Sequence, residues 1–141
     1  MQRLKVILAH GPFFRMISKI LGITESQVIT TEFTYTGREI LAAQDHFPGN
    51  LICPAIFLIE AMAQSAGQIA VRRKELRGLL PSLSGIERFR VRRPIRPGAV
   101  LRIESEIVRL RSTAGKAECK IYDDDQEVAD MKFTFTLTKT Q

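Results

Sequence analysis

The chain has 141 residues, of which 45% are hydrophobic and 26% are charged, so its composition fits one globular domain over residues 1–141 and excludes a disordered chain. Its two cysteines, Cys53 and Cys119, are too few for a disulfide scaffold, and two histidines and two cysteines far apart in sequence form no zinc-ligand cluster. The first ten residues carry no signal-peptide pattern, so we expect a cytoplasmic protein with free thiols.

The net charge of +6 is unevenly distributed along the chain. Residues 72–111 contain 12 Lys/Arg against 4 Asp/Glu, a net +8, whereas the rest contains 9 against 11, a net −2. A basic segment of this kind favours an anionic partner such as a nucleic acid, an acidic membrane or an acidic protein, and the alternative is a solvated strand face. No nucleic-acid motif accompanies the charge, and aromatic residues are not interleaved through it as stacking platforms.

Two elements are predicted in the first forty residues. Residues 10–22 (HGPFFRMISKILG) predict a short amphipathic element that ends at Gly22. Residues 27–36 (QVITTEFTYT) are rich in β-branched and aromatic residues and are followed by Gly37, which predicts a strand.

Residues 54–73 predict a helix with apolar side chains on nearly every face. Pro54 suits the first turn of a helix, where its missing N–H costs nothing. Residues 47–71 contain one formal charge, Glu60, so we expect the helix to be buried. The polar side chains that interrupt it are too numerous for a membrane span, and they are Glu60, Gln64, Ser65 and Gln68.

Four further strands are predicted, over residues 85–93, 100–110, 116–122 and 127–138. In the last of these, apolar side chains alternate with Lys132 and threonines, which is the pattern of a half-buried antiparallel strand; the apolar positions are Met131, Phe133, Phe135 and Leu137. One long buried helix with five or six mostly antiparallel strands indicates an α+β fold in which a curved sheet wraps the helix.

Glu60 is the strongest single indication of function. An unpaired buried carboxylate is costly, so its pKa tends to rise and the group stays protonated. A protonated carboxylic acid on an apolar helix can act as a proton donor. Gln64 lies one turn further on the same face and can hydrogen-bond the carboxyl group. The alternative is a structural polar pair that fixes the helix against a neighbour.

His46 lies in a predicted loop ahead of the helix, fourteen residues before Glu60. Histidine is the usual general base near neutral pH. Pro48 and Gly49 predict a rigid turn that can present the imidazole to a cavity, the alternative being an ordinary surface histidine. His10 has no comparable setting, and the sequence leaves open whether it lines the same pocket or lies on the surface.

Several short motifs occur together in the chain. HFPGN at residues 46–50 is followed by Pro54 and by EAMAQ at residues 60–64. ILAHGPF at residues 7–13 precedes them, and RRPIRPG at residues 92–98 follows them. In combination and order these motifs resemble the 3-hydroxyacyl-(acyl-carrier-protein) dehydratases of the FabZ type, and the likeness spans nearly the whole chain.

The resemblance implies a hot-dog fold, in which a curved antiparallel β-sheet wraps a long central helix. It also implies a homodimer, or a trimer of such dimers, with an active site at the subunit interface formed by the histidine of one chain and the glutamate of the other. The implied reaction removes water from a 3-hydroxyacyl thioester to give a trans-2-enoyl thioester in fatty-acid or specialised lipid or polyketide biosynthesis. The substrate is carried on the phosphopantetheine arm of an acyl carrier protein, and the chemistry needs no metal or redox cofactor.

For this reaction we expect His46 to take the C2 proton and a protonated Glu60 to supply a proton to the leaving hydroxyl. Free N–H groups at the helix N-terminus, near Ala55, would face the thioester carbonyl. The other expected substrate-binding residues are Gln64, Gly49, Phe47 and Phe57; Tyr35 and Met62 are further candidates for the acyl channel, with plain core as the alternative. The residues expected to dock the acidic carrier protein are Arg72, Arg73, Lys74, Arg93 and Arg96.

The chain departs from the family pattern at several positions, which indicates a divergent member. Ala55 and Asp45 stand where glycine is common, Ile17-Ser18 replaces an Asp-Arg pair, and Ala99 replaces an aspartate. The alternatives are a non-catalytic acyl-carrier-binding or assembly subunit, a hot-dog thioesterase, and a dehydratase-isomerase, whose group commonly has aspartate in place of Glu60.

Overall fold

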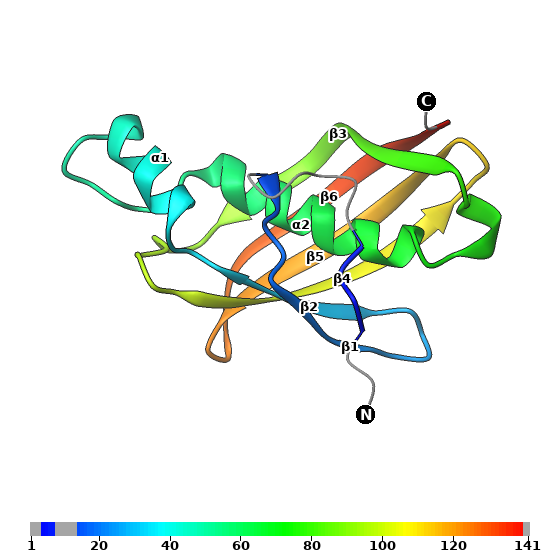
Figure 1. Ribbon diagram of the computed structural model, residues 1–141, viewed down its shortest axis with the longest axis horizontal. Helices are drawn as coiled ribbons and strands as arrows, with labels where there is room; N and C mark the ends of the chain where they lie inside the picture. The colour runs from blue at the N-terminus through cyan, green and yellow to red at the C-terminus, as the bar shows by residue number, and fades with distance from the viewer. Residues whose placement is uncertain (1–3, 8–13, 140–141) are drawn as a thin grey trace.

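The computed structural model describes residues 4–7 and 14–139, and it contains a long helix and a six-stranded antiparallel sheet (Figure 1). The helices are α1 (Arg38–His46), α2 (Ala55–Ala70) and the short 3-10 helix η2 (Lys74–Leu76). The strands are β1 (Lys19–Ile23), β2 (Ile29–Thr34), β3 (Leu79–Val91), β4 (Val100–Leu110), β5 (Ala114–Asp123) and β6 (Gln126–Lys139). Their order across the sheet is β1-β2-β4-β5-β6-β3.

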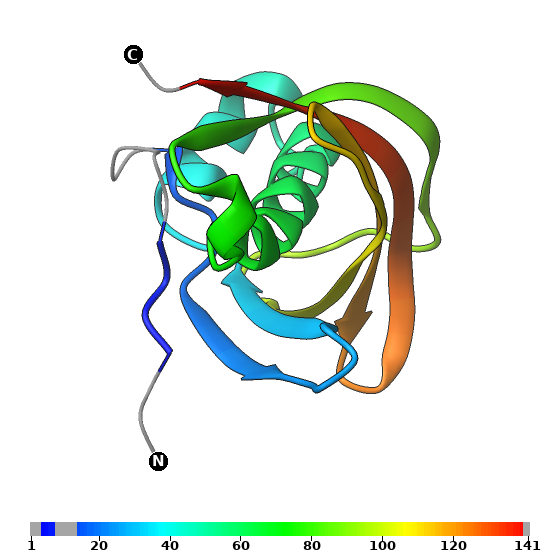
Figure 2. The same cartoon turned by 90° about the vertical axis from the view of Figure 1, so that its right-hand side faces the viewer.

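The sheet curves around α2, as the end-on view in Figure 2 shows. This arrangement is the hot-dog fold, so the predicted fold class is confirmed. Pro54 stands at the N-cap of α2 with ψ 139°, and Ala55 is the first helical residue. The expected start of this helix is therefore confirmed, and most of its length after Phe57 is buried or half-buried, but it ends at Ala70, three residues before the predicted end at residue 73.

The core forms where the apolar positions of α2 meet the inner face of the sheet. Leu58, Met62 and Ile69 are almost fully buried on the helix. On the last strand, β6, the odd-numbered positions from Met131 to Leu137 are buried, whereas Lys132 and the threonines between them are more exposed. The alternation predicted from Met131 onward is thus confirmed, whereas residues 128–130, earlier in the same strand, are all buried.

The interpretation of residues 10–22 as an element that ends at Gly22 is wrong in the part that the structure describes. Lys19–Ile23 forms strand β1, which continues through Gly22 and pairs with β2. The register shifts between Ile20 and Gly22, so the glycine sits at an irregularity of the strand. Pairing with β2 decides the conformation here, against the local helical pattern. His10, with residues 8–13, lies outside the described residues.

His46 is the last residue of α1 and does not lie in a loop, so that expectation is corrected. Only Ala43 is buried on α1, which leaves the helix with a weak apolar pattern in the sequence. The turn predicted after it is confirmed: the Asn50 N–H donates to the Phe47 carbonyl at 2.9 Å, and Gly49 has φ +84°, which favours glycine.

Strand β3 begins at Leu79, six residues before the predicted start at residue 85. The extra segment contains Pro81, which cannot donate to a sheet ladder and is tolerated in strands at the edge. Since β3 is an edge strand of the sheet, Pro81 does not interrupt it. The other strands predicted after the helix are found with bounds close to those expected.

Candidate active site

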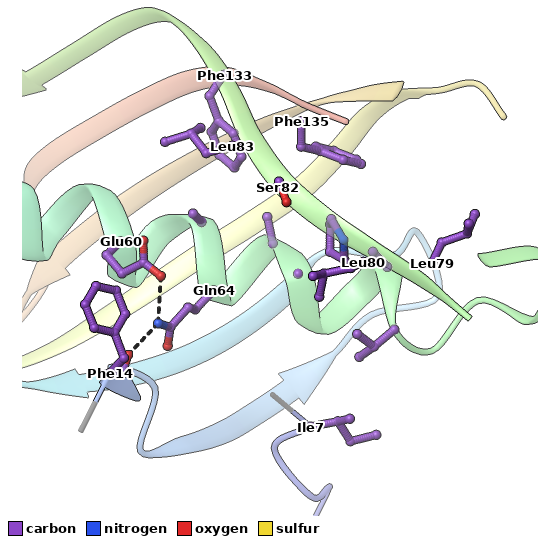
Figure 3. Close-up of a pocket in the computed structure, with 16 residues that line it drawn as sticks. Ile7, Phe14, Glu60, Gln64, Leu79, Leu80, Ser82, Leu83, Phe133 and Phe135 are labelled. Atoms are coloured by element: carbon purple, nitrogen blue, oxygen red, sulfur yellow. Dashed lines mark hydrogen bonds between the residues drawn. The ribbon is translucent and has the colours of Figure 1, made fainter. Parts of the chain in front are cut away.

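A cavity of about 670 Å³ lies between α2 and β3 (Figure 3). Its volume is in the range of small-molecule sites, which run from ~300 to 1,000 Å³. Most of its lining is apolar and comes from small side chains of α2 and from the first half of β3. The lining residues are Ile7, Phe14, Glu60, Ala63, Gln64, Ala66, Gly67, Ala70, Val71, Leu79–Leu83, Phe133 and Phe135.

Glu60 supplies the cavity's only carboxyl group among the described residues, at one end, as Figure 3 shows. Its side chain is half-buried on α2. Gln64 Nε2 donates a hydrogen bond to Glu60 Oε1 at 2.9 Å, which is the i to i+4 pairing expected from the sequence. The carboxyl group is therefore held in a defined orientation toward the apolar space.

Gln64 is fully engaged by protein groups. Its Nε2 also donates to the Phe14 carbonyl at 2.7 Å, and its Oε1 accepts from the Met16 N–H at 2.8 Å. An amide has two donors and one carbonyl oxygen, so these three bonds occupy both donors and the acceptor. Gln64 lines the cavity as expected, but its contacts are those of a residue that positions Glu60.

His46 is exposed at the end of α1 and does not line the cavity in the described part of the chain. Its ring lies against Phe47, with centroids 4.3 Å apart, and Phe47 is itself 62% exposed. A single chain therefore presents Glu60 at a cavity and His46 on its surface. This geometry is consistent with a site completed by a second copy.

The other expected binding and channel residues also lie outside the cavity, and Phe47 and Gly49 among them are exposed in the turn after α1. Ala55 is exposed at the start of α2, where Pro54 makes no side-chain capping bond. Phe57 packs at the edge of the core, and Met62 is fully buried in it. The Tyr35 hydroxyl donates to the Leu51 carbonyl at 2.7 Å, which fixes the segment that leads into α2.

The basic residues expected to dock a carrier protein fall at opposite ends of α2. The Cys53 N–H donates to the Ile95 carbonyl at 2.8 Å, which places Arg93 and Arg96 beside the helix N-terminus. Residues 72–74 follow the helix C-terminus, about 24 Å away along a sixteen-residue helix.

Contacts of these basic side chains differ. Arg72 donates to the Gln68 carbonyl at 2.8 Å and also to the Lys5 carbonyl. Arg73 lies 4.0 Å from Glu75, and Arg93 lies 3.2 Å from Asp123. Lys74 and Arg96 are exposed, and neither has a side-chain partner among residues 4–7 and 14–139.

The wall of the cavity was not predicted from the sequence. On α2 this wall consists of Ala63, Gly67 and Ala70, whose sequence pattern indicates only an apolar helix. A glycine inside a helical pattern is unfavourable and often has a packing or functional reason, so Gly67 was the available signal. No local pattern could place β3 opposite it.

Chemically, the site holds one carboxyl group at the end of an apolar space large enough for an acyl chain. Within the described ranges, no group of three or more His, Cys, Asp or Glu side chains is arranged to hold a metal ion. The same residues include no helix long and apolar enough to cross a membrane.

Comparison with known protein families shows to which family the chain belongs. The family model of the FabA-like domain matches residues 8–132. The chain belongs to the FabA-like family. Among its curated relatives is the 3-hydroxyacyl-(acyl-carrier-protein) dehydratase FabZ of Caldicellulosiruptor saccharolyticus, 32% identical over 131 residues and 93% of each chain. The FabZ of Pelotomaculum thermopropionicum is 33% identical over 135 residues and 96% of each chain.

Solved structures support the fold of this FabA-like chain. The dehydratase heterocomplex ApeI:P from Xenorhabdus doucetiae matches with a TM-score of 0.76 at 18% identity, over 93% of this chain and 88% of that one. A hypothetical thioesterase with coenzyme A from Streptococcus pneumoniae TIGR4 matches with a TM-score of 0.66 at 14% identity, over 87% of each chain. At these identities the likeness shows the hot-dog fold alone.

Proposed function

We propose that this FabA-like protein dehydrates a 3-hydroxyacyl thioester carried by an acyl carrier protein. The observation that carries the proposal is the Glu60 carboxyl group, held by Gln64 at the end of an apolar cavity. The FabZ names of relatives at about 30% identity over nearly the whole chain support the same reaction. The product belongs to fatty-acid or specialised lipid biosynthesis.

In the proposed mechanism His46 and Glu60 have complementary roles. An imidazole nitrogen of His46 takes the C2 proton, and the electrons of that C–H bond form the C2=C3 double bond. The C3–O bond breaks, and protonated Glu60 donates its proton, so that the hydroxyl leaves as water. His46 then holds one proton more and Glu60 one fewer, and transfer through water restores both.

The start of α2 is proposed to bind the thioester oxygen. The first amides of a helix have no intrahelical acceptor, and Pro54 provides no side-chain cap. Those N–H groups, near exposed Ala55, can stabilise the negative charge that develops on the carbonyl oxygen during removal of the C2 proton. The mechanism uses no metal or redox cofactor, since it consists of two proton transfers and the loss of water, with no net oxidation or reduction.

The active unit is proposed to be a homodimer in which His46 of one copy meets Glu60 of the other. Support comes from the exposed position of His46 and from β3, which ends the sheet as an unpaired edge of thirteen residues. Leu83, Ile86 and Val91 on this edge are each at least 40% exposed. Long, apolar edge strands are usually covered by a partner.

Carrier docking is proposed at the end of the molecule where α2 begins. Arg96 and Arg93 lie there, at the same end of the helix as Glu60. A basic surface attracts acidic carrier proteins and orients them at encounter. The compartment is proposed to be the cytoplasm, where the buried thiols Cys53 and Cys119 stay reduced.

Mass spectrometry of 3-hydroxyacyl carrier substrates tests the function directly. We expect the protein to remove one water from at least one substrate, and we expect the His46→Ala and Glu60→Gln variants to be slower by about 10²–10⁴-fold. Near-wild-type rates in both variants would overturn the assigned roles. Binding of the carrier without loss of water from any substrate would instead support a non-catalytic carrier-binding subunit.

A further inference from the structure

We propose that the cavity binds the acyl chain of the substrate and that Gly67 is a specificity-determining residue, which keeps the channel open for chains longer than about eleven carbons. This inference rests on the proposed dehydratase function and adds the substrate class. The occupant is the hydrocarbon tail of the same thioester whose third carbon lies at Glu60.

The cavity extends along α2 from Glu60 toward the helix C-terminus. Glu60, Ala63, Gly67 and Ala70 recur at intervals of three and four residues, so they share one face of the helix. Over the ten residues from Glu60 to Ala70 a helix rises about 15 Å. Figure 3 shows Glu60 at one end of the pocket and Leu79 at the other.

Beyond Gln64 the lining is suited to a hydrocarbon. The α2 wall is formed by alanines and Gly67, and the facing β3 wall by Leu79–Leu83, in which Ser82 is the one polar side chain. Phe133 and Phe135 of β6 contribute buried rings to the same space. A polar or charged substrate tail would find almost no hydrogen-bond partner here.

Gly67 stands about midway along this wall. A Cβ atom built at Gly67 meets no heavy atom within 4 Å outside its own helix and chain neighbours. No packing contact among the described residues therefore requires glycine at this position, although glycine is a poor helix former. A larger side chain would project into the cavity, because Gly67 lines it.

The rise of α2 between Glu60 and Gly67 gives the number of acyl carbons that fit between them. An extended hydrocarbon gains about 1.3 Å along its axis for each C–C bond of about 1.5 Å. Gly67 lies seven residues beyond Glu60, a rise of about 10 Å, so it faces the chain about eight carbons beyond the reacting carbon. Ala70 lies about twelve carbons beyond it. Because the reacting carbon is the third of the chain, Gly67 faces about the eleventh carbon, so substrates of four or eight carbons end before it and a sixteen-carbon substrate extends several carbons past it.

The direction of the chain follows from the start of α2. The thioester oxygen is proposed to bind the free amides near Ala55, which precede Glu60 on the helix axis. The tail must then extend the other way, past Gly67. In this orientation the carrier lies at the Arg93 and Arg96 end, which agrees with the docking proposed above.

The test compares Gly67→Leu with Gly67→Ala on carrier substrates of four, eight, twelve and sixteen carbons. Burial of each methylene contributes roughly fourfold to binding, so blocking the several that lie past residue 67 lowers kcat/KM for the sixteen-carbon substrate about 10²-fold in Gly67→Leu, whereas the twelve-carbon substrate, which has only one or two carbons there, loses about tenfold. The four-carbon substrate is expected to react within about threefold of wild type, because its chain ends before residue 67. Gly67→Ala is the matched control, since it improves helix propensity while adding only one methyl group, and it should keep most long-chain activity.

The dependence of kcat/KM on acyl-chain length is compared between Gly67→Leu and wild type. Suppose that wild type dehydrates all four substrates. If Gly67→Leu then lowers kcat/KM equally for all of them, or for none, the acyl chain does not pass residue 67 and this inference alone is overturned. If wild type dehydrates no substrate, the proposed function fails and this inference fails with it. Gly67→Met, with a flexible side chain of similar volume, replaces Gly67→Leu if the latter does not fold, and the same outcomes apply.

Discussion

At the scale of single residues, Gln64 and Gln68 occupy equivalent places one turn apart on α2. The Gln68 amide donates to the Ile7 carbonyl at 2.8 Å and accepts from the Ile7 N–H at 2.9 Å. Gln64 makes the same kind of pair with Phe14 and Met16, but it alone also reaches Glu60. Both therefore hold the N-terminal segment against the helix, and one of them also orients the carboxyl group.

Variants of Gln64 and Gln68 distinguish the positioning of Glu60 from a purely structural role. Gln64→Leu leaves the buried Met16 N–H unpaired and should lower the free energy of unfolding by about 1–3 kcal/mol, whereas Gln68→Leu frees the backbone groups of the exposed Ile7 and should lower it by about 0.5–1.5 kcal/mol. Only Gln64→Leu should also lower kcat, by about tenfold or more, because Glu60 loses the hydrogen bond that orients it. Denaturant titrations and steady-state kinetics measure the two effects. Equal values of kcat in the two variants would contradict the positioning role.

The two cysteines give a second prediction at this scale. Burial raises the pKa of both the Cys53 and Cys119 thiols to about 12, with the Glu39 charge adding to the effect at Cys53. The thiolate is the reactive form, so both should resist iodoacetamide at pH 8 in the native protein and react rapidly in denaturant. Mass spectrometry counts the modified thiols. Fast labelling of the folded protein at either site would contradict the buried placement.

The same shift makes stability depend on pH. In the unfolded chain the Cys119 thiol ionises with its ordinary pKa of 9.0, whereas in the native protein it stays neutral up to about pH 12. The stabilisation from the neutral native form is complete below about pH 9 and is lost as the pH rises toward 12, at up to about 1.4 kcal/mol per pH unit. The stability advantage of wild type over Cys119→Ala should therefore shrink across this range, as measured by chemical denaturation. A difference that stays constant from pH 8 to 11 would exclude this linkage.

At the scale of elements, β3 is joined to β6 by an unusual ionic cluster. Asp130 of β6 is 2% exposed and accepts from Arg88 Nε at 3.0 Å and from Arg92 Nη1 at 2.6 Å, with Arg90 Nε at 3.6 Å. Burial alone would raise the pKa of Asp130, but the hydrogen bond from Arg92 and the charges of the three arginines outweigh it and lower that pKa. The carboxylate thus binds arginines at alternate positions, Arg88 and Arg90 of β3 and Arg92 directly after the strand.

Removing this carboxylate should loosen the edge strand. Asp130→Asn leaves three arginines without their shared partner, and because they are 40–57% exposed we expect a loss of about 1–3 kcal/mol near pH 7. A lowered pKa means that the stabilisation is present above about pH 4 and is lost as the pH falls through the native pKa, so the two proteins should converge in acid. Denaturation at pH 7 and at pH 3 measures this. An equal difference at both values would contradict it.

Elements whose burial is visible in their own sequence pattern could be predicted. Elements whose conformation depends on pairing with a distant segment could not. Residues 131–138 alternate because that part of β6 has one buried and one more exposed face, and residues 54–70 are apolar all round because the sheet encloses α2. Residues 19–23 are a strand because β2 pairs with them, which no local pattern indicates. The cavity was missed for the same reason, since its walls lie on α2 and β3 and meet only in the fold.

At the scale of the whole molecule, the basic residues beside the two ends of α2 can be compared as docking sites for the carrier protein. In Figure 1 the connection from β3 to β4 lies at the end where α1 and the start of α2 are found, and η2 lies at the opposite end. Arg96 belongs to the first end and Lys74 to the second, and both side chains are exposed. If the carrier docks beside Glu60, Arg96→Glu should raise the Kd for an acidic carrier at least about fivefold, whereas Lys74→Glu should change it less than about twofold.

Ionic strength provides the control for this comparison. Attraction between exposed charges is screened over about 8 Å at physiological salt, so the Arg96→Glu effect should diminish as salt is raised to about 1 M. Fluorescence anisotropy with a labelled carrier measures both dependences. A larger effect of Lys74→Glu would place docking at the C-terminal end of α2 and contradict the proposed orientation of the substrate.

The proposed division of the active site between two copies can be tested by combining two inactive chains. One chain exposes His46 on α1 and places Glu60 in a cavity that His46 does not line. In a symmetric dimer each site would then take one residue from each chain. Two inactive chains, His46→Ala and Glu60→Gln, should therefore restore activity when they are combined, because a mixed dimer contains one site with both residues intact.

Coexpression of the two variants with different affinity tags, followed by sequential purification, isolates the mixed dimers. Each mixed dimer has one intact site of two, so its turnover should be about half that of wild type, while each parent variant stays at least about 10²-fold slower. If both residues of a site came from the same chain, every site in the mixed dimer would lack one of them and turnover would stay at the level of the parents. That result would require His46 and Glu60 to meet within one chain, which the fold of the isolated chain does not provide.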